Sequence, residues 1–315
     1  MSEEWIIKSD RLTKLYGQTA ALKDANIRIK KGSIYGLVGN NGAGKTTFLK
    51  ILTGQIRPTS GSFTMMGADT ESGYRQARTK TGAIIETPGF YPKLTARQNL
   101  EYYRIQRGIP GKESVDKMLE LVGLSDAGKK KFANLSLGMK QRLGLALALM
   151  GDPELLILDE PINGLDPAGI VEIRNLLLKL NKEKGVTILI SSHILTELEN
   201  IATDYGFLSR GELAEQISAE KLREKCRTFL EIKVTDVASY TALLESEMLC
   251  SNYRVLPDNC IHILEKVDNI ADYSALAVNH GIGLLGFEMK EINLENYYMN
   301  LIGDREEAED KQRRM

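Results

Sequence analysis

A glycine-rich loop is the feature of this sequence whose residue types and spacing most directly indicate chemistry. It follows an apolar segment at residues 33–38, matches the pattern G-x-x-x-x-G-K-[S/T], and precedes apolar residues at helical spacing. Small residues in such a loop let successive backbone N–H groups surround phosphate oxygens at a helix N-terminus. The predicted phosphate site comprises Gly39, Asn40, Asn41, Gly42, Ala43, Gly44, Lys45, Thr46 and Thr47.

Two side chains of this loop have predicted roles of their own. Lys45 is expected to neutralise the β- and γ-phosphate oxygens, and the Thr46 hydroxyl is expected to ligate Mg²⁺. The simpler alternative is a glycine turn with an exposed lysine. The strand and helix that flank the loop favour a phosphate site.

A second candidate site is an apolar strand, Leu155–Leu158, that ends in two adjacent acids. Beside a phosphate loop, Asp159 is expected to hold Mg²⁺ directly or through water. Glu160, pointing the other way, is expected to polarise an attacking water. An acidic turn after a strand is the plain alternative, and the phosphate loop upstream in the same chain argues against it.

The elements that must position these residues alternate between strands and helices. Strands are expected at residues 5–7, 25–29, 33–38, 155–158 and 186–190, and helices after the loop, within 94–124 and through 170–180. Apolar strands that alternate with helices predict an α/β fold with a parallel sheet covered by helices.

The pattern changes near residue 218. The remainder is expected to run strand, helix, two strands, helix and strand, followed by a helix at 294–302 and a charged tail at 306–315. That order suggests a small α+β domain and is compatible with a ferredoxin-like arrangement.

Composition excludes several classes of protein. The 315 residues carry 41 Lys and Arg against 42 Asp and Glu, so a strongly basic nucleic-acid binder is disfavoured. The three cysteines show no short C-x-x-C spacing, which argues against a disulfide scaffold or a cysteine zinc site. We expect no secretory signal at the acidic N-terminus and no bilayer-spanning segment.

Further motifs follow in an order that resembles the ATP-binding subunits of ABC transporters. Residues 134–142 resemble the signature motif, Asn163–Asp166 the D-loop and Ser191–His193 the switch-histidine segment, and Tyr16 stands where an adenine-stacking aromatic is expected. The resemblance covers about residues 5–217. It implies a P-loop NTPase cassette at 1–217, with a mixed sheet and a helical insert at about 87–150, and it leaves the α+β domain at 218–315 as an accessory domain.

The resemblance also implies roles for single residues. Ser136 would cap a helix that begins near Gly138 and presents free N–H groups to the γ-phosphate held by the opposite subunit. His193 would contact the γ-phosphate and orient the attacking water. A lone histidine or tyrosine is usually structural, and only the position of His193 and Tyr16 among the other motifs favours a functional role.

Two motifs, the signature and the segment around Glu86, depart from the family pattern. The usual signature has Gly-Gly-Gln after its serine, so Leu137 stands in place of a glycine and Met139 in place of the glutamine, which changes the predicted contact surface between subunits. Glu86 stands where the family has a glutamine that senses Mg²⁺ and the transporter. A carboxylate would still coordinate Mg²⁺ but cannot donate a hydrogen bond when ionised. Family drift without functional meaning is the alternative.

Glu86, the segment 90–100 after it and the segment 293–298 resemble cassettes of bacitracin and lantibiotic export or immunity systems. This resemblance implies an ATPase that uses ATP and Mg²⁺, forms an ATP-sandwich homodimer and drives a separate permease from the cytoplasmic face of the membrane, without nucleic acid. A cassette for another cargo, a soluble ATPase acting on ribosomes or DNA, and a regulatory module with little turnover remain alternatives.

Overall fold

The computed structural model describes residues 4–86, 89–226, 228–265, 267, 269–291 and 294–302. The chain divides into two compact units, and the boundary in the sequence follows Ala219. The sequence predicted the boundary at 217, two residues earlier. Among the described residues, no helix combines the length and the apolar character that crossing a bilayer requires.

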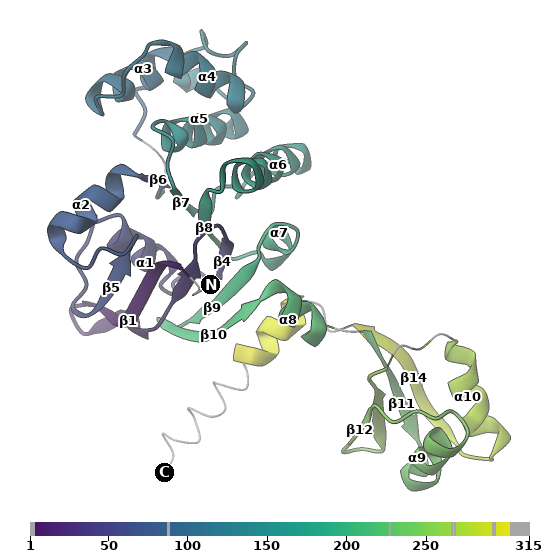
Figure 1. The fold of residues 1–315 in the computed structure, drawn as a ribbon. Helices are drawn as coiled ribbons and strands as arrows, with labels where there is room; N and C mark the ends of the chain where they lie inside the picture. Colours follow the sequence, from purple (N-terminus) through teal and green to yellow (C-terminus); the bar gives the residue numbers. More distant parts are fainter. Residues whose placement is uncertain are drawn as a thin grey trace. The chain divides into compact units, whose positions relative to one another are not determined.

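A six-stranded sheet forms the centre of the first unit, with the order β10-β9-β4-β8-β7-β6 (Figure 1). All neighbouring pairs are parallel except β9 and β10, so the sheet is mixed, as predicted. Its strands are β4 (Ile34–Val38), β6 (Thr81–Ile84), β7 (Leu155–Asp159), β8 (Thr187–Ser192), β9 (Asp204–Ser209) and β10 (Glu212–Ser218).

The apolar runs of the central strands explain their position. Every residue of β4 and of β8 is buried, which is typical of parallel strands covered on both faces. Parallel strands also bring their carboxyl ends to one edge of the sheet. The phosphate loop after β4, the acids at the end of β7 and Ser191–His193 at the end of β8 therefore lie side by side.

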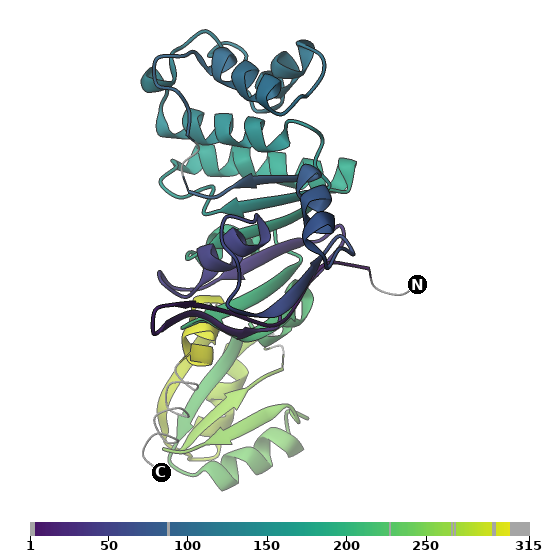
Figure 2. The same cartoon turned by 90° about the vertical axis from the view of Figure 1, so that its left-hand side faces the viewer.

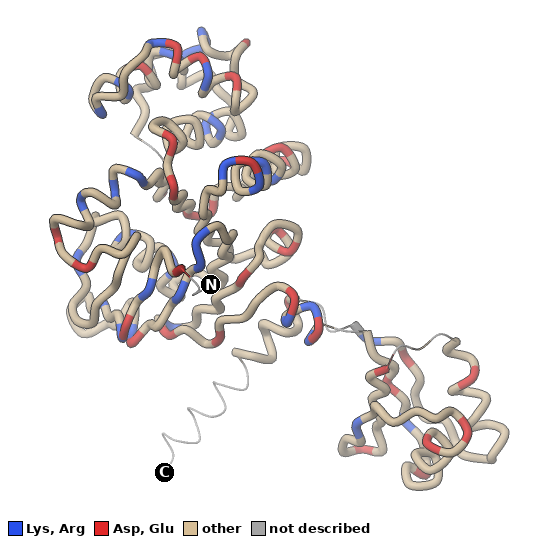
Figure 3. Tube along the Cα trace, in the orientation of Figure 1, with Lys and Arg blue, Asp and Glu red and all other residues tan. Residues whose placement is uncertain are grey.

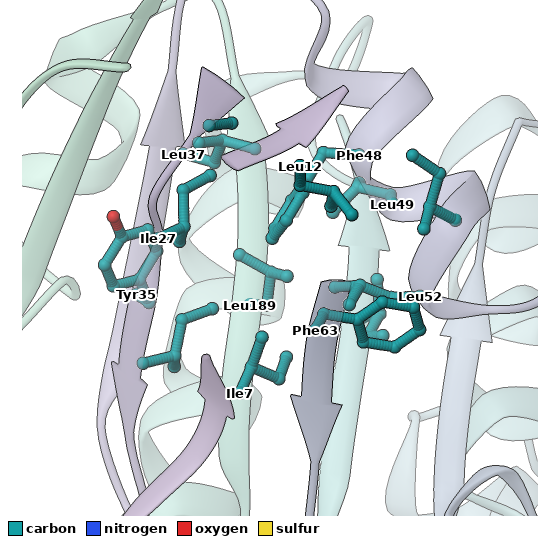
Figure 4. Close-up of a cluster of buried hydrophobic side chains, with 14 of the residues drawn as sticks. Ile7, Leu12, Ile27, Tyr35, Leu37, Phe48, Leu49, Leu52, Phe63 and Leu189 are labelled. Atoms are coloured by element: carbon teal, nitrogen blue, oxygen red, sulfur yellow. The ribbon is translucent and has the colours of Figure 1, made fainter. Parts of the chain in front are cut away.

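A second, antiparallel sheet packs over the first, with β1 (Trp5–Tyr16) in contact with β2 (Thr19–Ala25), β3 (Arg28–Lys30) and β5 (Ser60–Met65). Helix α1 (Lys45–Leu52) buries Phe48, Leu49 and Leu52 in the core that both sheets share (Figure 4). This packing holds the helix that follows the phosphate loop in a fixed direction, since a close-packed core tolerates few alternative arrangements.

The helical insert forms a layer of its own, visible in Figure 2. Helices α3 (Ala96–Gln106), α4 (Glu113–Leu121) and α5 (Leu137–Leu149) contact one another, and α5 also contacts β6. Thr95 and Gln98 form a capping box that fixes the start of α3. The insert predicted at about 87–150 includes Thr87 and Pro88, which lie outside the described residues.

Among the remaining helices of this unit, α6 has the clearest sequence signals at both ends. In α6 (Pro167–Lys184), Asp166 caps the N-terminus, proline occupies the first turn, and Gly185 ends the helix with φ +66°. The others are the 3₁₀ turn Phe132–Asn134, α2 (Glu71–Thr79) and α7 (Leu195–Glu199).

The second unit contains a four-stranded antiparallel sheet with the order β12-β13-β11-β14. After α8 (Ala219–Lys225), the βαββαβ sequence of elements and this strand order are ferredoxin-like. Its elements are β11 (Thr228–Val234), α9 (Val237–Ser246), β12 (Tyr253–Leu256), β13 (Cys260–Ile263), α10 (Ile270–Asn279) and β14 (Leu284–Glu291), with a helix at 294–302.

Charged residues are distributed over both units. Figure 3 shows Lys and Arg interspersed with Asp and Glu along the described chain, in agreement with a net charge of −1. The charged tail at 306–315 and Asn293 of the C-terminal segment lie outside the described residues.

Candidate ATP site

The phosphate loop has a backbone that requires glycine at two positions. Gly44, which caps α1, has φ +105°, and a Cβ there would lie 2.4 Å from the carbonyl oxygen of Ala21. A Cβ on Gly39 would lie 2.4 Å from the carbonyl oxygen of Leu208. Because the first N–H groups of a helix have no partner within it, the loop and the start of α1 together form a cradle that suits a phosphate group.

Lys45 is almost completely buried within this loop, at 5% exposure. Its Nζ donates to the carbonyl oxygens of Gly39, at 2.6 Å, and Asn40, at 3.3 Å, and lies 3.4 Å from Glu160 Oε1. The ammonium is thus held at the inner side of the cradle. There it can exchange carbonyl contacts for phosphate oxygens with little movement.

The predicted Mg²⁺ ligands of the loop and of β7 are adjacent. Thr46 Oγ1 donates to Asp159 Oδ2 at 2.8 Å, although the two residues are far apart in the sequence. Ser191, opposite Asp159 in the β7–β8 register, donates to Asp159 Oδ1 at 2.6 Å. A hydroxyl and a carboxylate are the donor types that Mg²⁺ prefers, so this pair fits the ion.

Ser191 is a member of the site that sequence reasoning missed as a functional residue. Its backbone oxygen and its Oγ both accept from the N–H of Glu160, at 3.2 and 3.1 Å. Together with its bond to Asp159, these contacts orient both acids. Two apolar strands that each end in polar residues are expected to pair in parallel, and this signal in the sequence could have identified Ser191 as a site residue.

Glu160 adopts an uncommon backbone conformation, with φ +46°. Asn163 Nδ2 donates to its Oε2 at 3.2 Å, and His193 Nδ1 lies 2.9 Å from the same oxygen. The buried Nδ1 of His193 therefore faces the Glu160 carboxylate directly. Both predicted catalytic residues therefore meet at one point beside Lys45.

The surroundings of His193 include one acid with a perturbed pKa. Glu197 accepts a hydrogen bond from the Ser192 hydroxyl at 2.8 Å. Burial raises the pKa of Glu197 above its ordinary value, against the opposing effects of that hydrogen bond and of His193. Glu197 is thus easier to protonate than a solvated glutamate.

Glu86 lies at the edge of the site and makes a different contact from the one predicted. Its Oε1 accepts from Lys50 Nζ of α1 at 2.6 Å, and its side chain is 65% exposed. It lines a cavity of about 520 Å³ together with Thr46, Asp159 and Glu160. The structure thus places Glu86 in the same cavity as the predicted metal ligands, with its carboxylate paired to a lysine.

The other predicted nucleotide contacts are Ser136, Gly138 and Tyr16. Ser136 caps α5 by accepting from the N–H of Met139 at 3.3 Å, and the helix begins at Leu137, one residue before the predicted Gly138. Ser136 and Gly138 line a separate hollow with residues 164–166. Tyr16, at the end of β1, is 50% exposed. Ser136 and Gly138 consequently lie outside the cavity that contains Thr46 and Asp159, where another subunit could contact them.

Similarity to known proteins agrees with this geometry. Residues 22–163 match the family described as ABC transporter. The bacitracin transport ATP-binding protein BcrA of Bacillus licheniformis is 43% identical over 95% of this chain and 97% of that protein. The chain belongs to the ABC transporter ATP-binding proteins. The lantibiotic transport ATP-binding protein SrtF of Streptococcus pyogenes is 42% identical over 70% of this chain and 95% of its own length.

Solved structures of ABC cassettes share the fold. A dimeric cassette in a post-hydrolysis state, bound to ADP and phosphate, superposes with a TM-score of 0.62 and 26% identity over 68% of this chain and 98% of its own. This ABC protein is an ATP-hydrolysing transporter subunit, as the sequence predicted. Subunits of this family work with a membrane permease and form dimers of cassettes.

Proposed function

We propose that this chain couples Mg²⁺-dependent ATP hydrolysis to a separate permease that exports peptide antibiotics or confers immunity to them. The observation that carries the hydrolytic part is the meeting of Thr46 and Asp159, 2.8 Å apart, beside the Glu160 carboxylate. The cargo class is supported by the bacitracin transport relative, whose similarity extends through both units of this chain.

Each residue of the site has a defined task in this proposal. The loop N–H groups and Lys45 bind the β- and γ-phosphate oxygens, while Thr46 and Asp159 would hold Mg²⁺. The ion, when bound, neutralises charge that develops on the phosphates. Glu160 then accepts a proton from the attacking water, and His193 orients that water against the γ-phosphate.

The site requires a second cassette in this proposal. Ser136 is exposed and lies at the N-terminus of the thirteen-residue helix α5, whose unpaired N–H groups favour an anion. In a head-to-tail homodimer, Ser136 and Gly138 of one copy would face the γ-phosphate on the loop of the other. The adenine would stack on Tyr16, whose ring is half exposed.

The permease partner would place the chain at the cytoplasmic face of the membrane. Co-purification from detergent-solubilised membranes tests this, because a multi-spanning protein should be recovered with the wild-type chain. Loss of resistance to bacitracin or a lantibiotic after gene deletion, restored by wild type but not by Glu160→Gln at equal abundance, is the expected result for the cargo. Recovery of ribosomal proteins or DNA instead would contradict the proposal.

A further inference from the structure

The second unit carries a cluster of three potential metal ligands on one face of its sheet. In β11, residues 230, 232 and 234 point into the core against α9 and α10, so Glu231 points to the opposite face. The register pairs Glu231 with His262 on β13, and Cys260 lies two residues from His262 on the same face. The strand pairing therefore brings a carboxylate, an imidazole and a thiol together.

The ligand atoms are close and partly shielded. The Cys260 Sγ, one ring nitrogen of His262 and one oxygen of Glu231 all lie within 4.8 Å of one another, with His262 Nε2 only 3.0 Å from Glu231 Oε2. The three side chains are at most 21% exposed, and Cys260 is buried. Phe229 packs on the His262 ring at 4.3 Å between centroids, which restricts its rotation.

We propose that Glu231, Cys260 and His262 bind a Zn²⁺ ion, with water as the fourth ligand. Thiolate, imidazole and carboxylate are the three protein ligands of zinc, and their combination favours it over Mg²⁺ or Ca²⁺. Tetrahedral bond lengths require ligand atoms about 3.3 to 3.7 Å apart, so small side-chain rotations from the present separations suffice.

Lys290 of β14 is a positioning residue for this site. Its Nζ donates to Glu231 Oε1 at 2.8 Å, which leaves Oε2, the oxygen next to His262, for the metal. Ligating carboxylates are commonly oriented by such an outer hydrogen bond. Binding would join β11 to β13 through side chains as well as through the backbone ladder.

Titration of the untagged, chelator-treated full chain with Co²⁺ tests the proposal. A thiolate-to-cobalt charge-transfer band should saturate at one ion per chain and disappear on addition of Zn²⁺. Because the described ATP site contains no cysteine, an ion bound there cannot produce the band. Cys260→Ser should abolish it, while His262→Gln and Glu231→Gln should weaken Co²⁺ binding at least tenfold.

Two matched variants control for nonspecific binding. His280 forms a similar pair with Glu247, at 3.0 Å, in the same unit, and His280→Gln should retain the full band. Cys226→Ser should also retain it. Circular dichroism and thermal unfolding in chelator establish that each variant is folded. No band in the wild type, or a band that survives Cys260→Ser in folded protein, would overturn the proposal.

Discussion

Two neighbouring strands of the central sheet are each followed by a glutamate with a left-handed backbone, and the two glutamates have different surroundings. Glu160 follows β7 with φ +46°, and Glu86 lies two residues beyond β6 with φ +60°. The Glu160 side chain is 24% exposed and lies against Lys45, Asn163 and His193. Glu86 is 65% exposed and pairs with Lys50.

This difference shows that the neighbours of a strand-end acid, more than its backbone, decide what it can do. A non-glycine residue with positive φ costs of the order of 1 kcal/mol or more, and such conformations concentrate at functional sites. At Glu160, Asn163 and His193 approach one carboxylate oxygen, and Lys45 lies near the other. At Glu86, the hydrogen bond to the carboxylate raises the pKa of Lys50, and the exposed glutamate lines a cavity that residues of the helical insert also line. We therefore expect chemistry at Glu160 and coupling at Glu86.

The largest expected effect is that of Glu160→Gln. Loss of the proton acceptor should lower turnover by about 10²- to 10⁴-fold and leave ATP binding intact, since the loop is unchanged. Steady-state hydrolysis and ATP binding measure the two effects. Size exclusion with Mg-ATP should show a trapped dimer, and a variant that stays monomeric at saturating ATP would contradict the two-cassette site.

The second largest effect on ATP binding and turnover is expected for Lys45→Ala. It removes the buried charge expected at the β- and γ-phosphates, so ATP affinity should fall about 10- to 100-fold, and turnover with it. Isothermal titration with ATP and hydrolysis at fixed ATP provide the measurement. Undiminished hydrolysis would mean that this loop is not the site.

Glu86→Ala should distinguish the role of Glu86 from that of Glu160 most clearly. If Glu86 serves coupling, the isolated chain should keep its ATPase rate within a fewfold while cells lose resistance. Glu86→Gln, of nearly the same shape, should fall between wild type and Glu86→Ala. Both activities are measured at matched abundance, and full resistance with Glu86→Ala would refute the coupling role.

Lys50→Met should have the smallest effect. It removes the 2.6 Å contact to Glu86, but an ion pair this exposed to solvent contributes less than about 1 kcal/mol to stability. Urea unfolding should show a shift within that limit, with the ATPase rate unchanged. A loss of resistance equal to that of Glu86→Ala would show that the pair, not the lone carboxylate, carries coupling.

Much of the first unit could be predicted because its signals are local. The apolar runs of β4 and β7, the glycine loop and the cap at Ser136 each lie within a few residues. Strands with weaker apolar patterns were missed, among them β5 (SGSFTM), and so was α2, which has a strongly polar sequence. These elements form because the core they cover is built from distant parts of the chain.

In the second unit, the βαββαβ order could be predicted from the alternating patterns of the sequence, and the structure has that order. The absence of C-x-x-C spacing led us to expect no cysteine zinc site. The Glu231, Cys260 and His262 cluster has no such spacing because its residues come from two strands. Its proximity depends on the β11–β13 register, which no single segment encodes.

By itself, the sequence determined the cassette family, the loop that can hold phosphates and the acids that follow β7, because each is a short motif with its own local geometry. Only the tertiary structure decided that Ser191 orients both acids, that Glu86 pairs with Lys50 and that Thr46 reaches Asp159. The reason is physical: these contacts join residues that only the pairing of parallel strands and the packing of α1 bring within hydrogen-bonding distance.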